Sequence, residues 1–216
     1  MEQVDALAPP MFKPSGERLT ATEAIWGGRW LGTVNIWVYR FNKGQIEFLY
    51  HERDPDSIWM PGRLDIAGGF YKAGEPKTKK SRLGGALREL EEEIGLKPKP
   101  NRLTYITRRL NVSISQKGNQ RKTCCDVYAL EFKPSDEVLL KHDIETGVLE
   151  ATATYWISLK DLLAMHKNHK VNIEVTRTAP DGSTTKRTVS ANDFCPNYDD
   201  YQFTMPATVS AVVKSQ

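Results

Sequence analysis

One segment, residues 81–94, constrains the fold of this chain more than any other. The apolar residues that recur there at the spacing of a single helical face are Leu83, Leu87, Leu90 and Ile94. We expect Ser81 to cap the start of this helix and Gly95 to end it. A helix with one apolar face must cover that face with another element, so the pattern predicts a layered fold around this helix.

Alternating segments rich in β-branched and aromatic residues predict strands on both sides of the helix. Residues 31–53 read as a hairpin with its turn at 42–44, and residues 171–190 read as a second hairpin around Asp181-Gly182. The polar stretch 72–80 is expected to be a loop, and a short helix is expected over 160–167. Residues 203–213 fit a helix or a strand equally well. The order of these elements predicts a mixed α/β (α+β) fold.

Composition limits the organisation and the partners of the chain. Its 216 residues suit a single domain over 25–216, with residues 1–24 expected to form an N-terminal tail or strap. A net charge of +3 is too small to indicate nucleic-acid binding, and no apolar run is long enough for a membrane helix. The N-terminus lacks a secretory pattern, and three scattered cysteines favour a reducing compartment, so we expect a cytoplasmic protein.

The helix also carries acidic residues on a face of its own. Relative to Glu89, Glu92 lies at about −60° and Glu93 at about +40°, while Glu91 points away from these three. A charge run of this kind is usually a solvated surface. Here, however, like charges at i and i+4 destabilise a helix unless a cation neutralises them. Mg²⁺, or Mn²⁺ in its place, suits such carboxylates, and the preceding Gly68-Gly69 pair permits a close backbone approach.

These residues resemble the signature of the Nudix hydrolase family. The family pattern is Gly, five residues, Glu, seven residues, Arg-Glu-aliphatic, one residue, Glu-Glu, one residue, Gly-aliphatic. The matching positions here are Gly69, Glu75, Arg88, Glu89, Leu90, Glu92, Glu93, Gly95 and Leu96. The departure is that twelve residues separate Glu75 from Arg88, which inserts five residues before the helix. Loops accept such insertions at little cost.

The resemblance implies a Nudix-type α/β/α sandwich with a mixed β-sheet. It also implies Mg²⁺-dependent hydrolysis of the diphosphate linkage in a nucleoside diphosphate joined to another group. The metal ligands it implies are Glu89, Glu92 and Glu93 with the Gly69 carbonyl. Arg88 would act through Glu75, and one of the three helix glutamates or Glu150 would serve as the base. We therefore expect the partner to be a small-molecule diphosphate rather than nucleic acid or a membrane.

Residues outside the signature leave other questions open. Arg63, Arg108 and Arg109 are candidate phosphate contacts, whereas the lysines at 72, 77, 79 and 80 read as solvated loop residues. Residues 59–75 also resemble enzymes related to isopentenyl diphosphate isomerase, but residues 65–69 lack the Cys and His that those enzymes need. A non-catalytic nucleotide-binding domain is a third reading, which the presence of all the glutamates disfavours. The extra hairpin and the N-terminal strap favour a homodimer.

Overall fold

The computed structural model describes residues 27–57, 60–72, 75, 78–114, 118–140, 151–195 and 201–215. The strands are β1 (Gly27–Asn42), β2 (Gln45–Arg53), β3 (Leu64–Asp65), β4 (Ala67–Phe70), β5 (Leu103–Ile114), β6 (Gln120–Glu131), β7 (Ala151–Ser158), β8 (Asn172–Thr178) and β9 (Thr184–Ser190). The helices are α2 (Lys79–Ile94), α3 (Leu159–Lys167) and α4 (Tyr201–Lys214), with short 3₁₀ turns at Pro100–Arg102 and Ala191–Asp193.

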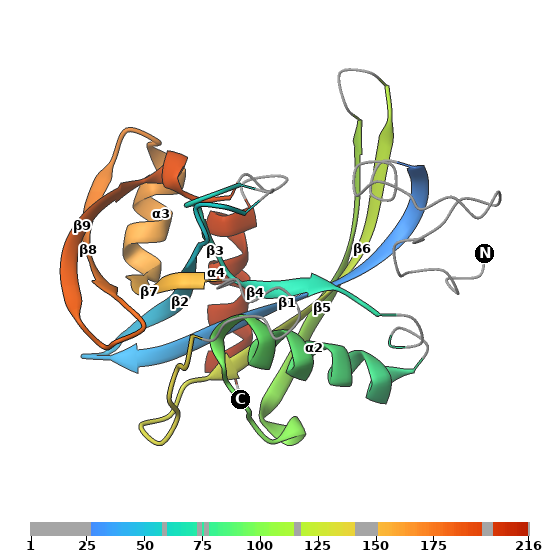
Figure 1. The fold of residues 1–216 in the computed structure, drawn as a ribbon, viewed down its shortest axis with the longest axis horizontal. Coiled ribbons are helices and arrows are strands. Elements are labelled where there is room, and N and C mark those ends of the chain that lie inside the picture. The colour runs from blue at the N-terminus through green and yellow to red at the C-terminus, as the bar shows by residue number, and fades with distance from the viewer. Residues whose placement is uncertain are drawn as a thin grey trace.

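The described strands form one mixed sheet in the order β5-β6-β1-β2-β7-β8-β9 (Figure 1). β1 pairs with β6 in parallel along most of its length, whereas the other pairs are antiparallel. The opposite edge of β1 is shared, because β4 pairs with residues 33–36 and β2 with residues 39–42. This shared edge brings the Gly68-Gly69 pair of β4 next to the middle of the sheet.

Helices cover both faces of this sheet, and each face has its own apolar core. Side chains of β1 alternate, so that Val34 and Ile36 pack with Leu90 and Ile94 of α2, while Trp37 packs on the other face. The opposite face is covered by α3 and α4. The predicted α/β/α sandwich with a mixed sheet is therefore confirmed.

Both predicted hairpins are present, and their turns explain their sequences. β1 and β2 are joined at Lys43 and Gly44, whose φ angles are 48° and 76°, as a tight two-residue hairpin turn requires. β8 and β9 are joined by a turn in which Gly182 has a φ of 79°. The positions of the turn glycines in the sequence thus correctly located both hairpins.

The start of α2 differs from the expected one. The N-cap is Thr78 rather than Ser81, and Ser81 instead forms the third helical residue of a capping box with Thr78. Lys79 and Lys80 consequently belong to the first turn of the helix and not to a loop. Gly95 ends the helix as expected, in the left-handed conformation with a φ of 70°.

The segment that pattern alone left undecided, residues 203–213, lies within the helix α4. Pro206 lies inside this helix and has no amide hydrogen to donate to the carbonyl of Gln202. The buried hydroxyl of Tyr50 donates to that carbonyl instead, at 2.9 Å. Periodicity left helix and strand open because most residues in the first two turns are buried. Within the described part of the chain, no helix has the length and apolar character to cross a bilayer.

Candidate active site

The acidic residues of α2 divide into buried and exposed ones. Glu89 and Glu93 are buried although they are charged, with 7% and 8% of their surface exposed. Glu92 lies at the edge of the same face, and Glu91 points away and pairs with Lys97 at 2.5 Å. Charged side chains are rarely buried unless they have partners. The burial of two of the three predicted ligands therefore directs attention to what surrounds them.

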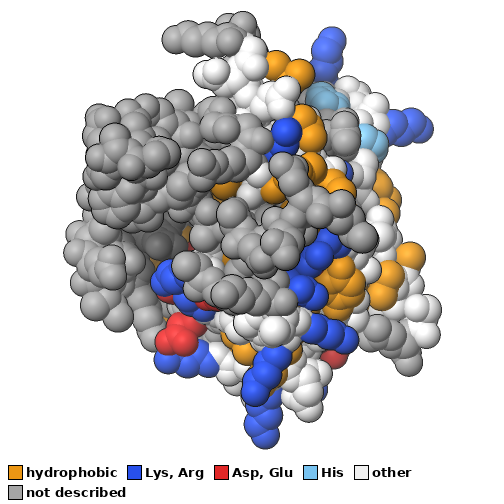
Figure 2. Space-filling model, turned by 90° about the vertical axis from the view of Figure 1, so that its right-hand side faces the viewer, with side chains coloured by type: hydrophobic (Ala, Val, Ile, Leu, Met, Phe, Trp, Pro, Cys, Tyr) orange, Lys and Arg blue, Asp and Glu red, His pale blue; other side chains and the backbone are white. Residues whose placement is uncertain are grey.

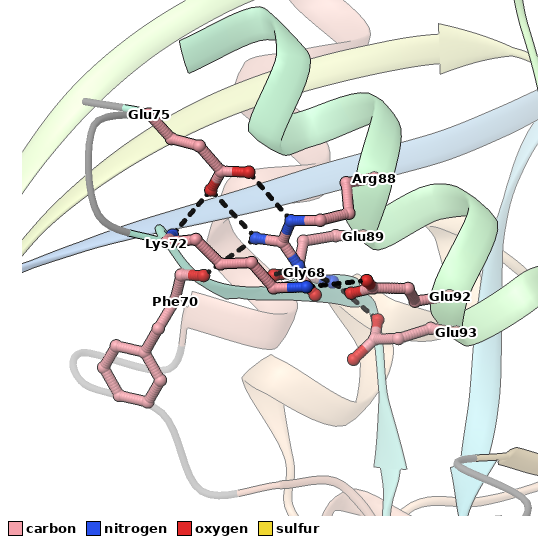
Figure 3. A network of polar contacts seen from close by, with 8 residues as sticks. All are labelled: Gly68, Phe70, Lys72, Glu75, Arg88, Glu89, Glu92 and Glu93. Carbon is pink, nitrogen blue, oxygen red and sulfur yellow. Dashed lines mark hydrogen bonds and ion pairs between the residues drawn. The ribbon is translucent and has the colours of Figure 1, made fainter. Parts of the chain in front are cut away.

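Arg88 is the centre of the network around these carboxylates (Figure 3). Its guanidinium contacts Glu75 at 2.8 and 3.0 Å, Glu89 at 2.8 Å and Glu92 at 2.6 Å, and it donates to the carbonyl of Phe70 at 3.0 Å. Although burial alone would lower the pKa of Arg88, these carboxylates raise it above its ordinary value. Arg88 thus fixes a helix, a loop and a strand relative to one another.

Glu75 reaches this network despite the insertion that follows it. Besides its paired hydrogen bonds with Arg88, Glu75 accepts a hydrogen bond from the backbone N–H of Lys72 at 2.6 Å. Partial burial would raise the pKa of this carboxyl, but the hydrogen bonds from Arg88 and Lys72 hold it below its ordinary value. The inserted residues therefore leave the Glu75–Arg88 pair intact.

The glycine pair of β4 lies directly against the acidic face. The backbone N–H of Gly68 donates to Glu93 at 2.7 Å. A Cβ atom at Gly69 would lie only 2.6 Å from Oε2 of Glu89, and one at Gly68 would collide with the carbonyl oxygen of Val34. A side chain at Gly68 would therefore meet backbone, whereas one at Gly69 would displace the carboxylate of Glu89 from its place beside the strand.

The negative charge of this face is partly neutralised by two cations of the chain itself, Arg88 and Lys72. Arg88 contacts one oxygen of Glu92, and the ammonium of Lys72 lies 3.1 Å from the other. Among the described residues, no three His, Cys, Asp or Glu side chains are already grouped as a metal site. The donor chemistry nevertheless fits Mg²⁺ or Mn²⁺, since three carboxylates share one helical face and a strand backbone lies against them.

Two of the predicted substrate arginines, Arg108 and Arg109, lie on opposite faces of the sheet, so at most one of them can face α2. Arg108 forms a double hydrogen bond with the buried Asp126 at 2.8 and 2.9 Å, and Tyr71 donates to the same carboxylate at 3.0 Å. Arg109 lies on the other side of the sheet, with its guanidinium 4.5 Å from the centre of the Tyr201 ring. The two hydrogen bonds between Arg108 and Asp126 hold neighbouring strands β5 and β6 together. Phosphate binding by Arg108 or Arg109 stays a prediction.

Three further residues considered in the sequence are Arg63, Glu150 and Lys72. Arg63 lies in the turn that links β2 to β3, where its backbone pairs with that of Arg53. Glu150 lies outside the described residues. Lys72, by contrast, was grouped with the solvated lysines, and its contact with Glu92 had no signal in the sequence pattern.

The comparison with protein families agrees with this geometry. The family model described as NUDIX domain matches residues 31–178. This range contains most of β1, the strands β2 to β8, the helices α2 and α3 and the whole network around Arg88. The protein therefore belongs to the NUDIX domain family, which confirms the family indicated by the signature.

A curated relative supports the same family over a shorter range. A protein from Clostridium acetobutylicum described as an uncharacterized Nudix hydrolase is 30% identical over 80 residues. The match covers 37% of this chain and 36% of that protein, so the chain spans about a third of the length of this relative.

Solved structures with a similar arrangement are more distant. They include a MutT/nudix family protein from Enterococcus faecalis (15% identity, 85% of this chain and 62% of that chain, TM-score 0.49). They also include a C. elegans Ap4A hydrolase in a binary complex (17% identity, 86% and 98%, TM-score 0.47). A third is the NUDIX domain of Shewanella oneidensis NrtR complexed with ADP ribose (18% identity, 63% and 77%, TM-score 0.44). The family assignment rests on the family model and the site rather than on these similarities.

Proposed function

We propose that this protein is a metal-dependent hydrolase that cleaves the diphosphate linkage of a nucleoside diphosphate joined to another group. The observation that carries the proposal is the network in which Arg88 joins Glu75 to Glu89 and Glu92 beside the Gly68-Gly69 backbone. Two buried glutamates beside a glycine backbone support a site that handles cations and phosphate.

Glu89, Glu92 and Glu93, together with the Gly69 carbonyl, would hold Mg²⁺ or Mn²⁺. When bound, such a metal supplies positive charge that neutralises the diphosphate and favours the attack of water on phosphorus. Glycine at 69 keeps the strand backbone against Glu89, so that carbonyl and carboxylate oxygens can be offered together. The burial of Glu89 and Glu93 excludes bulk water from one side of the site.

Arg88 and Glu75 act as positioning residues in this proposal. They hold α2 against the carbonyl of Phe70 in β4 and so set the distance between the glutamates and the glycine backbone. The base that takes the proton from water is one of the helix glutamates or Glu150. The three cysteines are buried and unpaired, in keeping with the expected reducing cytoplasm.

The direct test is a substrate screen in the presence of Mg²⁺. The panel contains nucleotide sugars, dinucleoside polyphosphates, ADP-ribose, NAD-type dinucleotides and oxidised nucleoside triphosphates, with release of monophosphate or phosphate as the readout. We expect metal-dependent cleavage of at least one member, lost on addition of a chelator. Binding of a panel member without cleavage of any would instead support the non-catalytic nucleotide-binding reading.

A further inference from the structure

Lys72 lies at the junction between β4 and the loop that carries Glu75. Its backbone N–H donates to Glu75, and its ammonium lies 3.1 Å from Oε1 of Glu92, as Figure 3 shows. Lys72 occupies one of the five positions between Gly69 and Glu75 for which the family signature specifies no residue. Its contact with Glu92 is therefore a property of this chain and not of the signature.

The two cations on Glu92 are held very differently. Arg88 has additional partners in Glu75, Glu89 and the Phe70 carbonyl, so its guanidinium is fixed. Among the described residues, the only hydrogen bond or ion pair of the Lys72 ammonium is with Glu92, and the side chain of Lys72 is 64% exposed. A lysine side chain of this kind can leave its partner and return to water at little cost.

Any metal ion that takes Glu92 as a ligand must compete with this ammonium. Both oxygens of Glu92 are in contact with cations, and a divalent ion placed beside them would be repelled by the charge of Lys72. The fixed guanidinium of Arg88 cannot leave without breaking the contacts that hold α2 to β4. Lys72 is therefore the cation that a metal ion would displace from Glu92.

We propose that Lys72 is a displaceable counter-ion of the metal site, which neutralises Glu92 before metal binds and sets how much metal is needed to replace it. The inference rests on the proposed function, because it requires that Glu92 is a metal ligand. Lys72 stabilises the acidic face of α2 in the metal-free protein and thereby lowers its affinity for Mg²⁺.

The chain offers a matched control at another glutamate of the same helix. Lys97 pairs with Glu91 on the face of α2 away from the site, and its side chain is 61% exposed, close to the 64% of Lys72. Binding of Mn²⁺ and Mg²⁺ is to be measured without substrate, by electron paramagnetic resonance and calorimetry, for the wild type, Lys72→Gln, Lys72→Arg and Lys97→Gln. The measurements are repeated at low and high salt.

We expect Lys72→Gln to bind metal roughly threefold to tenfold more tightly than the wild type, with the difference shrinking as salt rises. Lys72→Arg should return toward the wild-type affinity, and Lys97→Gln should stay within about twofold of it. If Lys72→Gln and Lys97→Gln bind metal alike, the inference is wrong while the metal site stands. If the wild type and all variants bind no metal, the proposed function fails and this inference fails with it.

Discussion

Glu91 and Glu92 are neighbours on α2 that carry the same charge in different surroundings. Glu91 pairs with Lys97 on the outer face, whereas Glu92 joins Arg88 and Lys72 at the site. Glu93, the next residue, is buried and accepts a hydrogen bond from Gly68. Of these three successive glutamates, Glu91 lies on the surface and Glu92 and Glu93 lie at the site. Substituting each in turn therefore compares a surface position with two site positions.

Glu92→Gln and Glu93→Gln are each expected to lower kcat by about two to four orders of magnitude, because each removes a charged ligand from the proposed site. Thermal stability should change little, because relief of the repulsion between like charges is offset by the loss of the contacts that Glu92 makes with Arg88 and Lys72 and Glu93 makes with Gly68. Glu91→Gln is the control and should retain the wild-type kcat. Full Mg²⁺-dependent turnover in both site variants would refute the metal assignment.

His51 of β2 is a buried residue outside this site, and stability should depend on its charge. Neither of its ring nitrogens has a hydrogen-bond partner among the described residues, and 2% of its surface is exposed. Burial lowers the pKa of His51 to about 4, against the effect of Asp65, which raises it. Because the unfolded imidazole titrates near 6.5, the unfolded state takes up a proton between these two values.

The contribution of His51 to the free energy of unfolding is therefore expected to be fully present above pH 6.5. It is expected to fall as the pH drops toward 4, by up to about 3 kcal/mol. Denaturant titrations at pH 7.5 and 5.0 measure this loss. His51→Gln cannot take up the proton, so its loss between the two pH values should be smaller. Equal losses in both proteins would mean that other groups cause the acid sensitivity.

At the scale of elements, α2 is positioned by its C-terminal end as much as by its apolar face. Gly95 adopts a φ of 70°, and a Cβ atom there would collide with the carbonyl oxygen of Leu139. Gly44, in the turn between β1 and β2, has a φ of 76° but nothing within 4 Å of the place where its Cβ would lie. The two glycines share a backbone conformation and differ in packing.

Gly95→Ala is expected to lower the free energy of unfolding by about 2–4 kcal/mol, from backbone strain and the collision together. Gly44→Ala should cost about 1 kcal/mol, from strain alone. Chemical denaturation of both variants measures the difference. Equal costs would show that the loop containing Leu139 moves away without penalty and does not position the helix.

The sequence predicted those elements whose signals are local. Turn glycines located both hairpins, and the leucine stripe with Gly95 located α2. The predicted N-cap was wrong because Ser and Thr both favour this position, and the backbone conformation, which a sequence does not show, selects Thr78 over Ser81. α4 was undecided because it is buried on several sides, which removes the periodicity that marks a helix.

In the candidate site, too, local signals were predicted and contacts between distant segments were not. The signature fixed the spacing of Glu75, Arg88 and the glutamates, and the structure brings them together. Arg108 could not be assigned from pattern, because its partner Asp126 is distant in sequence and pairs with it only through the register of β5 and β6. Lys72 was missed for a similar reason, since Glu92 meets it only when β4 packs against α2.

At the scale of the whole molecule, the side on which α2 begins carries many Lys and Arg side chains and few acidic ones in view (Figure 2). Lys79 and Lys80, in the first turn of α2, are exposed. Replacing both with Ala should raise KM for a diphosphate substrate mainly at low salt, because their attraction acts over a distance that salt shortens to about 8 Å. Steady-state kinetics at two salt concentrations test this. A fall in kcat at constant KM would instead show a role in the reaction itself.

The sheet has an apolar edge that favours the expected homodimer. β5 ends the described sheet, and its side chains Leu110, Val112 and Ile114 are 53–67% exposed. Light scattering at micromolar concentration is expected to give a dimer, and Leu110→Lys with Ile114→Lys to give a monomer. Leu163→Lys on α3, another exposed leucine, is the control. A monomeric wild type would contradict the predicted homodimer.

The pairing of β1 with β6 also has a consequence for how the chain is made. β1 is complete at Asn42, but its parallel partner ends at Glu131, after β2, β4, α2 and β5 have been synthesised. At ordinary rates of translation the nascent chain waits roughly 5 to 20 seconds with one edge of its longest strand unpaired. Ribosome-bound chains that stop before β6 should therefore be captured by chaperones, and those that extend well past Glu131 should escape them.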